Sequence, residues 1–277
     1  VRDEARAQTL LALGRDLARG PRELVLARLA ATAAELGTAH AWAEQARDEL
    51  AAAGVRARLA AFTPSAPGED AVRLSAQQDV DLLLTDVGPD ELERLPAELE
   101  ELLEGAACDV GLVTALAAPA AEGTARVLVP FGGAEHDWAA VELAAWLARA
   151  TAGRLVLAGT VGDPDGGRRD ASRLLASASL IVQQVAGVAA EPALVDAGAE
   201  GVLSAAAGAR AVVVGLSDRW RREGVGAERL ALARGVAAPT VLVRRGVRPG
   251  GLSPAESLTR FTWTIASAVP GGPATGT

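Results

Sequence analysis

Short apolar runs alternate along the second half of the chain with segments that carry apolar residues at helical spacing. The apolar runs predict strands, and they lie at 126–130, 154–161, 191–195, 211–216 and 239–244. The segments between them predict helices, at 137–150, 168–185, 200–207 and 226–234. Strands that are apolar throughout and alternate with helices indicate a parallel sheet covered on both faces. The pattern therefore predicts a doubly wound α/β domain.

The first half repeats this order with weaker patterns. The predicted strands lie at 23–29, 55–62, 80–86 and 109–114. The predicted helices lie at 2–18, 40–53, 69–78 and 90–105. We therefore predict an α/β fold with two tandem doubly wound parallel-sheet domains.

The two halves align with an almost constant offset. Leu82-Leu83-Leu84 falls on Val212-Val213-Val214 at an offset of 130, and Leu24-Val25-Leu26 falls on Leu155-Val156-Leu157 at 131. This similarity indicates a domain duplication. The strand that begins at Arg126 would have its counterpart before Val1, so we expect the first domain to lack its first strand. We expect the natural chain to extend upstream, in agreement with the absence of methionine.

Composition marks the domain boundaries. Small residues with Pro119 and Gly123 interrupt the periodic patterns and predict a linker at 115–125. The expected division is a degenerate domain at 1–114, this linker, a second domain at 126–245 and a Pro- and Gly-rich tail at 246–277. Within the tail, 257–263 holds Phe261 and Trp263, and we expect this aromatic segment to dock on a domain or on a neighbouring subunit.

Charge and composition exclude several function classes. A net charge of −8 would repel a phosphate backbone, which argues against nucleic-acid binding. The chain contains no lysine, so Schiff-base chemistry and a Walker-type phosphate loop are excluded. With two histidines and one cysteine, Cys108, neither a disulfide framework nor a structural zinc site is expected.

Several segments resemble a known family. The segment VLVPFGGAEHDWAAVELAAWLA at 127–148 is similar to the opening strand, loop and helix of universal stress protein domains, and AVVVGLSDRWRREGVG at 211–226 with PTVLVRR at 239–245 resembles their glycine loop and closing strand. A narrower resemblance is to the cytosolic C-terminal region of bacterial monovalent cation:proton antiporters. It is carried by VLVPFGGAEHDWAA, GRRDASRLLASASL, VGLSDRWRREG and the end VRRGVRPGGLSPAESLTRFTW. This resemblance implies a regulatory role, with ion transport performed by other segments.

The family resemblance also implies where an adenine nucleotide would bind. Family members that bind ATP carry an Asp after the first strand and a loop of pattern G-x2-G-x9-G-[ST], in which glycine lets backbone N–H groups approach the phosphates. The candidate binding residues in this chain are Pro130, Gly132, Gly133, Gly215, Ser217, Asp218, Arg219, Gly226 and Ala227. Gly132 replaces the Asp, Asp218 replaces the second glycine, the spacer is seven residues long, and Ala227 replaces the hydroxyl residue.

Two interpretations of this loop stay open. Arg219, Arg221 and Arg222 could bind an anion in spite of Asp218. They could instead form a solvated loop with ion pairs to Asp218 and Glu223. The first-half counterpart at 86–89 has lost the pattern, so only the second domain is a candidate for ATP or another adenine nucleotide, and no cofactor is certain.

Catalysis is not expected. His136 and Asp137 could form a triad with Ser217 or Ser204, but the nucleophile-elbow pattern fails after Ser217. We expect Asp137 to cap a helix and His136 to be partly exposed.

The resulting prediction is a non-catalytic regulatory module of tandem universal-stress-type domains, forming the cytosolic C-terminal part of a cation:proton antiporter. We expect a homodimer on the cytoplasmic side, tethered to the inner membrane by a transporter segment upstream in the same natural chain. The alternative is a stand-alone soluble tandem stress protein that binds an adenine nucleotide.

Overall fold

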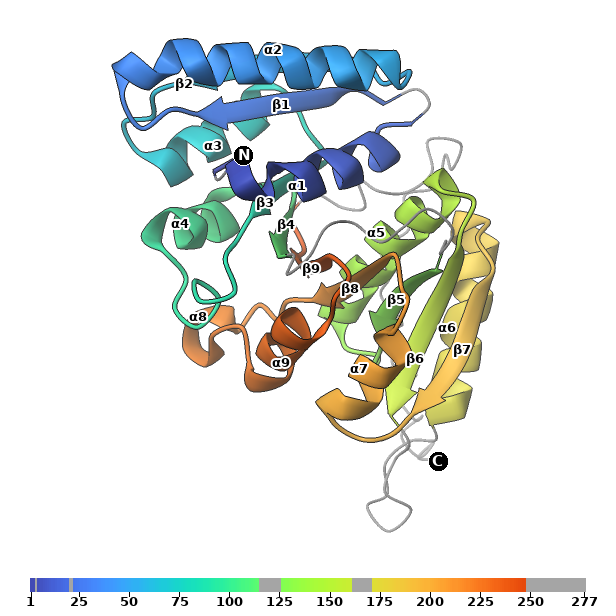
Figure 1. Ribbon diagram of the computed structural model, residues 1–277. Helices are drawn as coiled ribbons and strands as arrows, with labels where there is room; N and C mark the ends of the chain where they lie inside the picture. Colours follow the sequence, from blue (N-terminus) through green and yellow to red (C-terminus); the bar gives the residue numbers. More distant parts are fainter. Residues whose placement is uncertain (3, 20–21, 115–125, 161–170, 248–277) are drawn as a thin grey trace, which may run out of the picture.

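The computed structural model describes residues 1–2, 4–19, 22–114, 126–160 and 171–247 (Figure 1). The strands are β1 (Leu24–Leu29), β2 (Ala57–Phe62), β3 (Leu82–Asp86), β4 (Asp109–Thr114), β5 (Arg126–Pro130), β6 (Arg154–Thr160), β7 (Ala190–Val195), β8 (Ala211–Gly215) and β9 (Thr240–Arg244). The helices are α1 (Glu4–Leu17), the 3-10 turn η1 (Ala33–Glu35), α2 (Leu36–Ala52), α3 (Pro67–Gln77), α4 (Ala97–Gly105), α5 (Glu135–Ala150), α6 (Ala171–Ala186), α7 (Ala199–Ala206), α8 (Trp220–Glu223) and α9 (Ala227–Gly235). The predicted linker at 115–125 and the aromatic segment at 257–263 lie outside the described residues.

The predicted α/β fold class is confirmed. The second half, residues 126–247, forms a parallel sheet in the order β9-β8-β5-β6-β7, with its first strand β5 in the middle. The first half, residues 1–114, repeats this arrangement as two separate parallel pairs, β1-β2 and β3-β4. No described strand lies between β1 and β3, which is the place that β5 occupies in the second half.

The two halves share one sheet, a feature that the sequence pattern did not predict. β4 pairs antiparallel with β9 over five residues, from Val110 opposite Arg244 to Thr114 opposite Thr240. The seven-stranded sheet therefore runs β3-β4-β9-β8-β5-β6-β7. This pairing gives each half's last strand a partner on the edge that would otherwise be unpaired.

Two hydrophobic cores lie on the two faces of this sheet, and each contains residues from both halves. One core packs α1 of the first half with α5 and α6 of the second, and Trp138 of α5 contacts Phe131 edge-to-face at 4.9 Å. The other core packs α4 with α7 and α9, and it includes Leu112 of β4 and Leu242 of β9. Both cores therefore run continuously past the β4–β9 pair.

Polar contacts also join the halves. The buried Arg244 donates from Nη1 to the Ala106 carbonyl oxygen at 3.1 Å, and the Gly246 amide donates to Asp109 Oδ1 at 2.6 Å. Burial raises the pKa of Asp109, and the Gly246 amide and nearby Arg245 act in the opposite direction. Further ion pairs across the junction are Asp16 with Arg210, Glu93 with Arg234 at 2.5 Å, and Glu104 with Arg221.

The largest local error of the sequence prediction concerns α4. A helix was expected from residue 90, but α4 begins at Ala97. Pro96 disfavours helical backbone at the residue before it, and Pro96 itself has an extended ψ of 149°. The segment 90–96 instead forms turns, and its Leu92 is buried in the core that α4 covers.

Candidate functional site

The predicted binding residues gather at one edge of the second-half sheet. β5 and β8 are parallel neighbours, so the turn after Pro130 and the loop after Gly215 both leave the sheet at its carboxyl edge. This edge is where ligands bind in doubly wound folds. The loop after β8 holds the short helix α8 and ends where α9 begins at Ala227.

Gly215 has a structural reason to be glycine. A Cβ atom at this position would lie 2.2 Å from the carbonyl oxygen of His136 and 2.9 Å from the backbone nitrogen of Asp137. The end of β8 thus touches the backbone at the start of α5, and only a residue without a side chain permits this approach. A phosphate is not needed to explain this glycine.

Arg229 connects the parts of the loop. From the first turn of α9, its Nε donates to the Gly215 carbonyl oxygen at 2.7 Å and its Nη1 donates to the Val225 carbonyl oxygen at 3.4 Å. Its Nη2 lies 3.0 Å from Nε2 of His136. A guanidinium group has only donors, so Nε2 is the acceptor in this contact.

The sequence patterns did not indicate the role of Arg229. The sequence feature that could have indicated this role is the place of Arg229 in the first turn of the predicted helix, three residues after Gly226. From that position a long donor side chain can reach back to carbonyl oxygens of the preceding loop.

Asp137 organises the turn after β5. Its Oδ2 accepts hydrogen bonds from the backbone amides of Gly132 at 2.9 Å and Ala134 at 3.1 Å. The expected capping role of Asp137 is therefore observed, at the start of a helix that begins two residues earlier than predicted. Gly133 adopts a φ of +83°, a left-handed conformation that favours glycine. Two amides that could have approached an anion are already bound to a carboxylate.

The loop after β8 is mostly exposed. Ser217 Oγ accepts from the backbone amide of Arg219 at 3.2 Å, and Arg219 lies 3.8 Å from Glu223. Asp218 and Arg219 are exposed. The predicted ion pair with Glu223 is present, whereas within the described part of the chain no ion pair joins Asp218 to a loop arginine. Arg221 instead pairs with Glu104 of the first half.

The start of α9 keeps part of a phosphate-binding geometry. Gly226 precedes the helix with a φ of +90°, and Ala227 is the exposed first helical residue. A helix N-terminus favours anions. Ala227 supplies no hydroxyl group.

The first-half loop is closed in a similar way. Asp86, which is buried, accepts from the backbone amide of Arg2 at 2.6 Å and from Arg6 Nε at 3.3 Å. Glu91 accepts from Arg2 Nη2 at 2.8 Å and from the Gly88 amide at 2.6 Å. Burial would raise the pKa of Glu91, but these hydrogen bonds outweigh burial and hold that pKa below its usual value. Arginine side chains of the chain itself therefore close the loop in each half.

These residues do not fit the triphosphate of ATP. In the second half the Gly132 and Ala134 amides bind Asp137, Asp218 replaces the second glycine of the family pattern with a negative charge, and Ala227 replaces its hydroxyl residue. Two donors at this edge are thus engaged, and two positions of the phosphate-binding pattern are replaced.

Within the described ranges, no hydrogen bond joins His136 to Ser217 or Ser204. No group of three or more His, Cys, Asp or Glu side chains in the described residues could hold a metal ion. No described helix is long and apolar enough to cross a membrane.

The second half forms a five-stranded parallel sheet, and the described strands of the first half form the same sheet without its central strand. The two sheets are joined through their last strands. This arrangement is the universal stress protein fold. A universal stress protein structure from Archaeoglobus fulgidus DSM 4304 superposes with a TM-score of 0.60 at 16% identity, covering 88% of this chain and 93% of that one. A universal stress protein structure from Pseudomonas aeruginosa UCBPP-PA14, described as putative, superposes with a TM-score of 0.52 at 15% identity, covering 87% of each chain.

The same fold occurs in a cytoplasmic domain of a transporter. The cytoplasmic domain of a prokaryotic cation chloride cotransporter superposes with a TM-score of 0.61 at 12% identity, covering 91% of this chain and 96% of that one. No protein-family model matches the sequence, and no curated protein sequence matches it. At these identities the comparisons establish the fold.

We predict that Gly215→Ala lowers the free energy of unfolding by about 1–3 kcal/mol without any ligand, because the new Cβ displaces the start of α5. Gly132→Ala, in the neighbouring turn after β5, is the matched control. Its Cβ would meet Asp137 Oδ2 at an ordinary 3.5 Å, so its stability should change by less than about 0.5 kcal/mol. Urea denaturation measures both. Equal changes in the free energy of unfolding for the two substitutions would show that Gly215 does not lie against the backbone of His136.

Proposed function

We propose that the chain is a non-catalytic regulatory module, the cytosolic C-terminal part of a cation:proton antiporter. The single observation that carries this proposal is the similarity to the cytoplasmic domain of a cation chloride cotransporter over nearly the full length of both chains. The antiporter-like segments at 127–140, 167–180 and 214–224 add support from the sequence. The inner membrane would then anchor the module through transporter segments upstream.

The continuous sheet suits such a role. Regulation requires that a change at one surface alters the free energy of a distant one. The β4–β9 pair, the shared cores and the ion pairs between halves offer a rigid path for this coupling. A ligand or partner that prefers one arrangement of the two halves would shift the population of that arrangement.

The engaged loop residues support a non-catalytic role. His136 Nε2 accepts from Arg229, and Ser217 Oγ accepts from the Arg219 amide. A general base and a nucleophile need to face each other. Here His136 contacts Arg229 of α9, and Ser217 contacts the backbone of Arg219 in the loop after β8.

The charge pair between Arg234 of α9 and Glu93 of the first half tests the regulatory coupling. In the natural full-length protein, reconstituted in vesicles, we expect Arg234→Glu to change cation:proton exchange several-fold, because it places two carboxylates together at the junction. The double variant Arg234→Glu with Glu93→Arg restores the opposite charges and should restore exchange. Arg47→Glu, on the exposed face of α2, is the control.

Absence of cation:proton exchange by the natural protein would contradict the antiporter assignment. The regulatory assignment would be contradicted if cation:proton exchange were unchanged both in Arg234→Glu and in the natural protein after deletion of the whole 277-residue module.

The alternative, an adenine-nucleotide-binding stress protein, rests on the exposed start of α9 at Gly226 and Ala227. We expect millimolar ATP to leave the melting temperature of the chain unchanged, because a ligand stabilises only by RT ln(1 + [L]/Kd), the Gly132 and Ala134 amides already bind Asp137, and Asp218 replaces a glycine of the phosphate-binding pattern. Differential scanning fluorimetry measures this. A saturable increase that is lost in Arg219→Ala with Arg222→Ala, but kept in Arg47→Ala, would favour nucleotide binding.

A further inference from the structure

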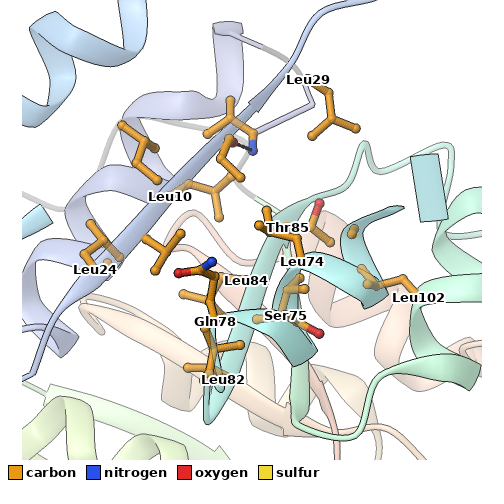
Figure 2. A pocket seen from close by; sticks show the side chains of 18 of the residues that line it. Leu10, Leu24, Leu29, Leu74, Ser75, Gln78, Leu82, Leu84, Thr85 and Leu102 are labelled. Carbon is orange, nitrogen blue, oxygen red and sulfur yellow. Dashed lines mark hydrogen bonds between the residues drawn. The ribbon is translucent and has the colours of Figure 1, made fainter. Parts of the chain in front are cut away.

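A pocket of about 720 Å³ lies between β1 and β3. We call this space the strand gap. Figure 2 shows Leu24 of β1 and Leu10 of α1 on one side, with Leu82 and Leu84 of β3 on the other, turned toward the same space. Helix α3, with Leu74, covers the gap from the opposite face of the sheet. Leucines thus line the strand gap from both faces of the sheet, with Ser75, Gln78 and Thr85 also in its lining, and apolar contacts on both faces are typical of a central strand in a doubly wound sheet.

The second half shows what such a site holds when it is filled. There β5 lies between β6 and β8 and pairs parallel with both. Leu155 of β6 and Val212 of β8, which flank β5, are 0% exposed. Their first-half counterparts Leu24 and Leu82 are only half-buried. The first half therefore presents apolar surface that an additional strand would bury.

One hydrogen bond fixes the alignment of the two sites. At the end of β5, the Phe131 amide donates to the Ala158 carbonyl oxygen at 2.8 Å. In the first half, the Val1 nitrogen donates to the Ala27 carbonyl oxygen at 2.7 Å. Val1 and Ala27 precede Phe131 and Ala158 by 130 and 131 positions, the offsets of the internal repeat. Val1 thus occupies the position that directly follows a central strand.

We propose that the strand gap binds an extended apolar segment of about five residues that directly precedes Val1, running parallel to β1 and β3 and pairing with both. Five residues at about 3.3 Å each match the length of the flanking strands. No described strand pairs with the edges of β1 and β3 that face the strand gap, so backbone groups of both strands can supply hydrogen bonds, and the leucines of both strands and of α1 and α3 select an apolar segment. This proposal is independent of the proposed function.

The charge state of Val1 supports this assignment. Burial lowers the pKa of the Val1 ammonium from 8.0 to about 6, with Asp86 opposing the shift and Arg28 and Arg2 adding to it. A buried ammonium is unfavourable, whereas a peptide N–H at the same place would donate the same bond to Ala27 without carrying charge. The site is thus better suited to a peptide bond than to a chain terminus.

The test adds the chain's own central strand to the first half. The sequence R-V-L-V-P of β5 is fused directly before Val1, and a matched control carries R-D-G-D-P, which has the same length and ends but aspartate in place of each valine and glycine in place of leucine. Hydrogen exchange is measured at the amides of β1 and β3. We expect the β5-like extension to slow exchange at these amides at least tenfold relative to the control and to raise the urea midpoint.

Equal exchange with the two extensions would overturn the proposal. It would also be overturned if the unextended chain already protected β1 and β3 as strongly as β6 and β8, because the strand gap would then hold another occupant, such as the tail of the same chain or an apolar ligand.

A second measurement does not depend on how the extended chain folds. In the chain prepared with Val1 as its first residue, the unfolded state binds a proton between about pH 6 and 8 that the folded state does not, so the urea midpoint should rise over this range. Acetylation of the Val1 nitrogen should abolish the rise. A midpoint that is independent of pH in the unacetylated chain would show that Val1 does not lie at the end of the strand gap.

Discussion

The antiparallel pairing of β4 with β9 is the constraint on which the rest of the structure depends. It joins strands that end the two halves of the chain, and it places Leu112 opposite Leu242 in the middle of a continuous sheet. The first half needs this pairing more than the second. Its strands β3 and β4 are separated from β1 and β2 by the strand gap, and an isolated pair of strands is only marginally stable. Through β9, β3 and β4 become part of a seven-stranded sheet whose two cores cover both faces.

The carboxyl-edge loops of both halves are held by arginine side chains of the chain itself. Arg2 Nη1 donates to the Asp86 carbonyl oxygen, Arg6 Nε donates to the Asp86 carboxylate, and Arg229 Nε donates to the Gly215 carbonyl oxygen. The loop of the second half further contacts the first half through Arg221 and Glu104. Glycine at 215 permits the close approach of the start of α5. The carboxyl edge thus contributes to the contact between the two halves.

Much of this fold could be predicted from local sequence patterns. The periodicity of apolar residues located all nine strands that the structure describes, with β4 and β5 predicted to the residue, because a strand buried on both faces is apolar at every position. The repeat offset predicted the missing first strand. Pro96 moved the start of α4, a local effect that the helical spacing of the surrounding apolar residues concealed.

What the sequence could not predict depends on contacts between distant residues. The partner of β9 is set by packing across residues some 130 positions apart, and no local period reports it. Arg229 was missed for the same reason, since its value lies in reaching His136 and Gly215 from other elements. The altered glycine loop could be recognised from sequence, but only the geometry shows that Arg229 binds two of its carbonyl oxygens and that Asp137 binds the amides of the neighbouring turn after β5.

The most direct test of this account is native-state hydrogen exchange at the amides of β4 and β9. If the pairing joins the halves into one cooperative body, Val110–Thr114 and Thr240–Arg244 will open with the same free energy, equal to that of global unfolding. If β4 exchanges with a clearly smaller free energy while β9 stays protected, the halves unfold independently, and the central claim is wrong.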